Sequence, residues 1–108
     1  MAVEIWHNPR CSKSRAALAY LEAKGIAPQV RLYLKDGPSQ EELRAMLMAL
    51  GLPASALLRK EGAALKGEAE NVIVAAMAVD PALIERPVIR SGSRAVIGRP
   101  AEAIDAIL

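Results

Sequence analysis

Hydrophobic and polar residues alternate in two short stretches near the start of the chain. The first is Val3-Glu4-Ile5-Trp6 and the second is Val30-Arg31-Leu32-Tyr33-Leu34. A period of two is typical of strands with one buried face, so both stretches are predicted strands. Between them, residues 12–24 have apolar side chains at helical spacing, and Gly25 suits the left-handed position after a helix end. The pattern predicts a strand–helix–strand unit with parallel strands and a right-handed crossover.

The middle of the chain has helical patterns. Ser39-Gln40-Glu41-Glu42 has the spacing of a capping box, and the amphipathic helix that it opens is expected to stop at Gly51. A short helix is predicted over residues 54–60. Residues 61–71 have two glycines and no clear period, so we expect a loop in which helix resumes near the end. Residues 72–79 are apolar throughout, and their length, their alanines and the Asp-Pro that follows favour a buried helix over a strand.

The last part of the chain predicts a hairpin and a helix. Two apolar runs, residues 87–90 and 95–97, flank Ser91-Gly92-Ser93, which is a turn signal. Pro100 is a favoured first residue of a helix. Three apolar residues of that helix are expected to face inward: Ile104, Ile107 and Leu108. The element order β-α-β, helical middle, β-β-α predicts an α/β fold with a mixed sheet flanked by helices.

The length and composition predict a single domain, residues 1–108, in the cytoplasm. The chain is 53% hydrophobic, and 14 basic against 12 acidic residues give a net charge of +2, too balanced to indicate a nucleic-acid or membrane partner. The start of the chain lacks the pattern of a signal peptide. The longest uncharged apolar run, residues 72–79, is far short of the ~20 residues that cross a bilayer. One cysteine makes no internal disulfide, which fits a reducing compartment.

The only cysteine, Cys11, lies between the first predicted strand and the start of the first predicted helix. Asn8-Pro9 is typical of a turn, so the thiol is placed at a helix N-terminus, where unpaired N–H groups favour a thiolate. Nearby Arg10, Lys13 and Arg15 add positive charge. We therefore expect the thiol to titrate below its free value of about 8.5 and to be nucleophilic. The alternative is an ordinary buried cysteine.

The surroundings of Cys11 narrow the chemistry further. Cys11-Ser12-Lys13-Ser14 has the spacing of a CxxC redox motif with serine in the fourth position. Because the chain has no second thiol, Cys11 cannot resolve its own adduct, and a catalytic cycle needs an external thiol such as glutathione. A phosphatase loop would have an arginine where this chain has Ala17, which argues against that class. One histidine with one cysteine makes no metal-ligand set, so no metal site is predicted.

Further candidates lie near Cys11 and far from it. Ser12 or Ser14 is a candidate cap for the first helix. His7 can tune the thiol or relay a proton, or it can simply satisfy the backbone at the strand end, and the sequence leaves both open. Three arginines stand at the edges of apolar segments: Arg59, Arg86 and Arg99. Each alone is compatible with a surface arginine, but if they converge on Cys11 they would form a site for a tetrahedral oxyanion.

Four segments together carry a family resemblance: His7-Asn8-Pro9-Arg10-Cys11-Ser12-Lys13-Ser14-Arg15, Leu57-Leu58-Arg59-Lys60, Arg86-Pro87 and Ile97-Gly98-Arg99-Pro100. In order and at similar spacings, nearly end to end, they resemble the glutaredoxin-dependent arsenate reductases. The resemblance implies a thioredoxin-like (glutaredoxin-like) fold with a mixed four-stranded sheet. It also implies a helical insertion between the second and third strands, at about residues 39–80.

The resemblance implies roles for individual residues. Cys11 would be the nucleophile, with His7 modulating it, and Pro87 would follow a cis peptide bond beside the cysteine. The oxyanion would be bound by three residues: Arg59, Arg86 and Arg99. Supporting roles would fall to the neighbours of the cysteine: Asn8, Ser12, Ser14 and Arg15. The chain departs from the family between residues 61 and 72, where it is several residues shorter, which leaves open how Arg59 is directed and how the thiol partner docks.

The function implied is reduction of arsenate to arsenite by a monomer without a bound cofactor. Glutathione would be the co-substrate and glutaredoxin the protein partner. One alternative is a redox-sensing regulatory protein that binds RNA polymerase, which would more naturally carry a second cysteine and need no arginine trio. Another is a glutathione-linked thiol oxidoreductase with a different substrate.

Overall fold

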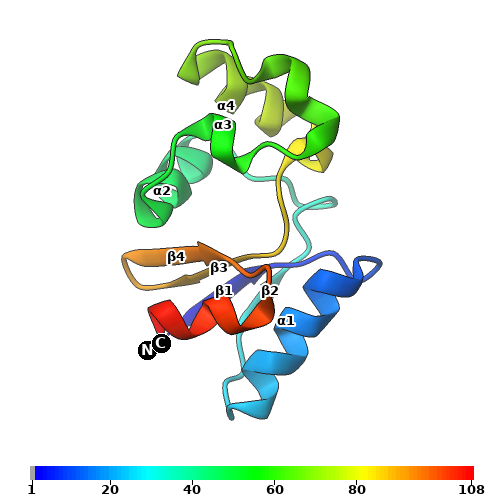
Figure 1. Cartoon of the computed structure of the whole chain (residues 1–108), viewed down its shortest axis with the longest axis vertical. Coiled ribbons are helices and arrows are strands. Elements are labelled where there is room, and N and C mark those ends of the chain that lie inside the picture. Colours follow the sequence, from blue (N-terminus) through cyan, green and yellow to red (C-terminus); the bar gives the residue numbers. More distant parts are fainter. Residues whose placement is uncertain (1) are drawn as a thin grey trace.

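A mixed four-stranded sheet forms the centre of the fold, with helices on both faces (Figure 1). The computed structural model describes residues 2–108. The strands are β1 (Val3–Trp6), β2 (Gln29–Arg31), β3 (Val88–Ser91) and β4 (Arg94–Ile97), in the order β2-β1-β3-β4. β1 is parallel to β2, whereas the β1–β3 and β3–β4 pairs are antiparallel. This confirms the mixed α/β sheet predicted from the sequence.

The period-two pattern of β1 divides the interior into two cores. Val3 and Ile5 face a core that also contains residues of α1 (Ser12–Ala23) and of η3 (Ala101–Ile107), a 3-10 helix. Trp6 faces the opposite core, which it forms together with residues of the helical segments between β2 and β3. The two cores therefore pack against opposite faces of the same sheet.

α1 begins directly at the cysteine. Cys11 is the N-cap residue, and no side chain caps the helix, so the prediction of a cap by Ser12 or Ser14 was wrong. The Ser14 hydroxyl is instead bonded to His7 and Asn8. Gly25 follows the helix with a φ of +76°, as its position predicted.

β2 is shorter than predicted. The alternation continues to Leu34, but the strand ends at Arg31, which is paired with the last residue of β1, Trp6. The last hydrogen bond of the pair runs from the His7 N–H to the Arg31 carbonyl, at 2.8 Å. The chain then folds into a turn in which the N–H groups of Lys35 and Asp36 donate to the Leu32 carbonyl, at 3.0 and 2.9 Å.

Five helical segments connect β2 to β3: α2 (Gln40–Leu50), α3 (Ala54–Leu57), η1 (Lys60–Leu65), α4 (Glu70–Val79) and η2 (Pro81–Leu83). The capping box of α2 is confirmed, with Ser39 accepting from the Glu42 N–H at 3.0 Å, and so is the stop at Gly51. The helix over residues 72–79 is also confirmed.

Two predictions for this region were wrong. α3 is shorter than the predicted helix, since it ends at Leu57, and the expected loop after it contains the 3-10 helix η1. The return to helix near the end of that loop is confirmed, because α4 begins at Glu70.

α3 ends because Leu58 is extended and pairs with Ile84. η1 forms at Gly62, whose N–H donates to the Arg59 carbonyl at 2.9 Å. A Cβ at Gly62 would lie 3.0 Å from a methyl carbon of Leu58, so the missing side chain lets the turn pack closely.

The predicted hairpin is confirmed. Ser91 is paired with Arg94 across a two-residue turn in which Gly92 has a φ of +62°. η3 follows Pro100 and buries Ile104 and Ile107, as predicted. Leu108 is 45% exposed, so the inward position predicted for it was wrong, because it follows the last helical turn. Of the helices within residues 2–108, none has the length and hydropathy to span a bilayer.

Candidate active site

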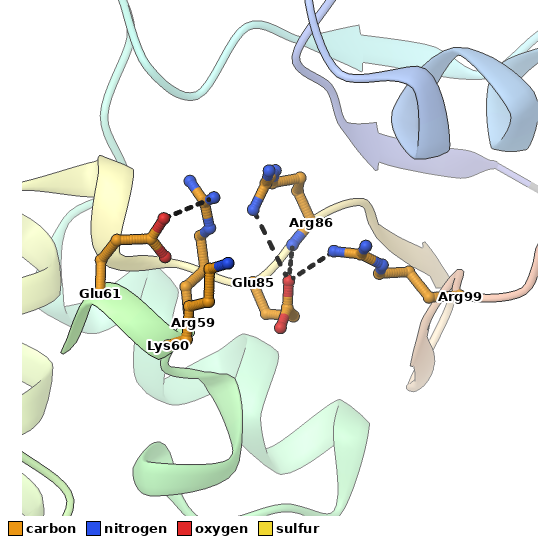
Figure 2. Close-up of a pocket in the computed structure, with 6 residues that line it drawn as sticks. All are labelled: Arg59, Lys60, Glu61, Glu85, Arg86 and Arg99. Atoms are coloured by element: carbon orange, nitrogen blue, oxygen red, sulfur yellow. Dashed lines mark hydrogen bonds and ion pairs between the residues drawn. The ribbon is translucent and has the colours of Figure 1, made fainter. Parts of the chain in front are cut away.

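Arg59, Arg86 and Arg99 converge on one pocket of about 330 Å³ (Figure 2). Arg59 follows α3, whereas Arg86 precedes β3 and Arg99 follows β4. The rest of the lining consists of Lys60, Glu61 and Glu85. The sequence predicted that the arginines could meet; it did not identify the two carboxylates among them.

An antiparallel bridge between Leu58 and Ile84 joins the two chain segments that supply most of the pocket. On either side of it, the backbone N–H groups of Arg59 and Glu85 donate across to the opposite segment, at 2.9 and 2.7 Å. Both Leu58 and Ile84 are buried. The direction of Arg59, which the shortened segment after it left open, is therefore set by pairing with the strand-like residues before β3.

Arg86 and Arg99 each precede a cis proline, Pro87 and Pro100. The cis bond expected at Arg86–Pro87 is confirmed. The second cis bond was not predicted. Next to it, Gly98 donates its N–H to the Pro87 carbonyl at 2.9 Å, and a Cβ at Gly98 would lie 2.6 Å from a methyl carbon of Ile89. The loop that carries Arg99 therefore packs so closely on β3 that a side chain at this position would require Ile89 to shift.

Both carboxylates of the pocket are paired with arginines. Glu61 lies 3.1 Å from Arg59, and Glu85 Oε1 lies 3.0 Å from Arg99 and 3.9 Å from Arg86. Glu85 stands directly before Arg86 in a segment that the sequence had already singled out for its arginine. The acidic residue next to Arg86 was the signal in the sequence from which a carboxylate in the pocket could have been predicted.

Cys11 is partly exposed. Arg86, which lines the pocket, also acts on the Cys11 thiol. Burial raises the pKa of the Cys11 thiol. The backbone N–H groups of Ser14 and Lys13 and the Arg86 side chain stabilise the thiolate, and together they bring the pKa below its ordinary value. The sequence predicted the contribution of the helix start. Arg86 is distant from Cys11 in the chain, so its contribution to the lowered pKa depends on the fold.

The turn before Cys11 is held by its own side chains. His7 is buried, and its Nδ1 lies 2.6 Å from the Ser14 hydroxyl, which also accepts from the Asn8 N–H at 3.0 Å. Arg15 donates to the Pro9 carbonyl at 2.9 Å. Burial, and then the charge of Arg15, lower the pKa of His7. Ser12 is exposed and lies outside this network.

Tyr33 is a further residue of the site that the sequence did not indicate. Its side chain is buried, and burial raises the pKa of the phenol, while Arg86 and Arg59 oppose the rise. The charges of Cys11 and Glu85 also act on this phenol. Tyr33 is therefore a neutral group beside the arginines and the thiol. Its place in an alternating run indicated only a strand.

The pocket combines a surplus of positive charge with a nucleophile. Three arginines and Lys60 face only two carboxylates, and guanidinium groups match the oxygens of a tetrahedral anion bidentately. A thiolate linked to such a pocket can attack the central atom of a bound oxyanion. Among residues 2–108, no group of three or more His, Cys, Asp or Glu side chains gathers as a metal site.

The fold and this site define a thioredoxin-like protein with one cysteine beside an arginine-lined pocket. The chain belongs to the ArsC family, whose model matches residues 6–107. It is similar to "Arsenate reductase" of Neisseria meningitidis serogroup A, at 40% identity over 98% of this chain and 97% of the relative. The same name is carried by a Haemophilus influenzae relative, 40% identical over the full length of both chains.

Solved structures agree with this assignment. "Arsenate reductase from Vibrio cholerae" is 45% identical and superimposes with a TM-score of 0.93, covering 100% of this chain and 98% of that one. The thioredoxin-like fold inferred from the four motifs is thereby confirmed.

Proposed function

We propose that this protein reduces arsenate to arsenite, with Cys11 as the nucleophile. The observation that carries the proposal is the convergence of Arg59, Arg86 and Arg99 on one pocket, with Arg86 also stabilising the Cys11 thiolate. Relatives of 40% identity that bear the name arsenate reductase support the same reaction. A thiolate and an oxyanion would both be held by Arg86, so that the attacking sulfur would lie next to the anion.

The proposed reaction has two stages. First, the Cys11 thiolate attacks arsenic, a sulfur–arsenic bond forms, and one arsenate oxygen leaves as water after taking up protons. A glutathione thiolate then attacks the sulfur of the adduct, so that arsenic gains an electron pair and leaves as arsenite. The product on the protein is a disulfide between Cys11 and glutathione, which glutaredoxin reduces by thiol exchange.

The need for an external thiol follows from the cysteine count. Cys11 is the only cysteine of the chain, so no second thiol of the same molecule can release the adduct. Glutathione as co-substrate, glutaredoxin as partner and a cofactor-free monomer are parts of the proposal. So are the supporting roles of His7, Asn8, Ser14 and Arg15, which hold the turn before the thiol, and of Pro87 beside Arg86. A role for Ser12 has the weakest support, because its side chain lies outside that network.

The experiment couples arsenate reduction to NADPH oxidation through glutathione, glutaredoxin and glutathione reductase. Wild-type protein is expected to consume NADPH only with arsenate present, and Cys11→Ser is expected to be inactive. Arg59→Ala should raise KM for arsenate, while Arg44→Ala, which removes an exposed arginine of α2 outside the pocket, should not. Absence of an arsenate-dependent rate with the reduced wild-type protein would overturn the proposal. A pull-down of RNA polymerase subunits would then test the regulatory alternative.

A further inference from the structure

The pocket contains a carboxylate where an anion is expected to bind. Glu85 Oε1 accepts from the Arg99 guanidinium at 3.0 Å and from the Arg86 backbone N–H at 3.2 Å, and it lies 3.9 Å from the Arg86 guanidinium. Figure 2 shows this oxygen between Arg86 and Arg99. Two of the three arginines proposed to hold the oxyanion are therefore also partners of one carboxylate.

The position of Glu85 is set by the backbone. Its N–H donates to the Leu57 carbonyl at 2.7 Å, next to the Leu58–Ile84 bridge, and its side chain is 27% exposed. By contrast, Glu61 is 50% exposed and has one arginine partner, Arg59. An anion that enters the pocket must meet the fixed carboxylate of Glu85, whereas Glu61 can turn to solvent.

A carboxylate in an anion site favours one kind of anion over another. It repels a fully deprotonated oxyanion, but it accepts a hydrogen bond from an oxyanion that keeps a proton on one oxygen. Near neutral pH, arsenate and phosphate keep such a proton, while sulfate and selenate keep none. A site built to bind a hydroxyl group discriminates strongly against an analogue that lacks it, because its acceptor stays unpaired.

The arginines still have donors for the remaining oxygens. Arg86 Nε is buried and makes no hydrogen bond to any residue among those that the structure describes. Within residues 2–108, the Arg59 guanidinium makes one hydrogen bond, from Nη2 to Glu61, and its other N–H groups are available. We propose that Glu85 is the specificity-determining residue of the pocket, accepting the O–H of a protonated tetrahedral oxyanion and thereby excluding fully deprotonated ones such as sulfate. This inference rests on the proposed function, because it takes the arginine pocket as the oxyanion site.

The test compares phosphate and sulfate, which have similar size and shape and are not reduced by thiols. Calorimetric titration of the reduced protein near neutral pH and at constant ionic strength is expected to show phosphate binding at least about tenfold more tightly than sulfate. Glu85→Gln should bring the two affinities within about threefold, mainly by strengthening sulfate. Glu61→Gln is the matched control: it removes the same charge from the same pocket and should change both affinities alike.

The wild-type ratio tests the inference without any variant. Equal binding of the two anions, no measurable binding of either, or a parallel gain for both in Glu85→Gln would overturn it. The outcome is separable from the proposed function, because the titration does not need turnover. A protein that prefers phosphate but does not reduce arsenate would contradict the proposed function alone. A protein that reduces arsenate but binds sulfate as well as phosphate would contradict this inference alone.

Discussion

Leu58 and Ile84 form an isolated antiparallel bridge between the helical region and the segment before β3, and this bridge joins the segment that carries Arg59 to the segment that carries Arg86. Neither residue carries chemistry. Both are buried, Ile84 with 0% of its surface exposed. The geometry of the arginine pocket is therefore fixed by an apolar contact and two backbone hydrogen bonds outside it.

Truncating this contact should weaken both stability and anion binding. Ile84→Ala is expected to lower the free energy of unfolding by about 2–5 kcal/mol, because it leaves a cavity in the core. In urea unfolding, Met48→Ala is the control, since Met48 is 85% exposed and its change should stay within about 0.5 kcal/mol. If Ile84→Ala lowers stability but leaves KM for arsenate unchanged, the bridge does not position Arg59.

The thiolate of Cys11 should depend on Arg86 and not on Arg99. Arg86 is one of the groups that lower the pKa of Cys11, so Arg86→Ala should raise that pKa. Arg99→Ala removes an arginine from the same pocket that is not among those groups, and it should leave the pKa in place. The measurement is the pH dependence of thiol alkylation. Equal shifts in the two variants would mean that only the net charge of the pocket matters.

Ser14 should matter more to stability than Ser12. Its buried hydroxyl is bonded to His7 Nδ1 and to the Asn8 N–H, so Ser14→Ala leaves both groups unpaired. The expected loss is about 1–3 kcal/mol in the free energy of unfolding. Ser12→Ala, at an exposed position two residues earlier, should change it by less than about 0.5 kcal/mol. Similar values for the two variants would show that the network contributes little.

His7 should make the protein less stable in acid. Burial and the charge of Arg15 lower its pKa, so the unfolded chain binds the proton more readily than the folded one. Stability is therefore full above the unfolded value of about 6.5 and falls as the pH drops through the folded pKa, by up to about 1.4 kcal/mol per pH unit. His7→Gln should remove this part of the slope.

The titration itself is easy to follow, because His7 is the only histidine of the chain. Its ring proton resonance should titrate below the value of a histidine in an unfolded peptide. A midpoint at or above that value would contradict the lowered pKa, and would mean that the ring can be charged when the thiol reacts.

The sequence predicted most of the fold, because its signals were local. The capping box at Ser39, the stop at Gly51 and the turn at Gly92 each follow from side chains a few residues apart. Prediction from the sequence failed where the end of an element depends on hydrogen bonds that the hydrophobic pattern does not show. The alternation through Leu34 continues past the end of β2, because the chain turns at Leu32, whose carbonyl accepts from the Lys35 and Asp36 N–H groups.

The site residues also divide into those predictable from neighbouring residues and those that only the fold brings together. The place of Cys11 at a helix N-terminus could be predicted from its neighbours. The convergence of the arginines came only from family resemblance, since each comes from a different element. Glu85 was missed because attention fell on the neighbouring Arg86. Tyr33 was missed because it was assigned only to a predicted strand. Only the fold brings both to the thiol and the pocket.

The order in which the site residues occur along the chain has a consequence for synthesis on the ribosome. Cys11 and the backbone groups of its helix emerge first, whereas Arg86 and then Arg99 emerge near the end. A nascent chain therefore exposes its thiol without the guanidinium that stabilises the thiolate in the finished protein. The contribution of Arg86 to the lowered pKa of the Cys11 thiol is therefore expected only once the segment before β3 has joined the fold.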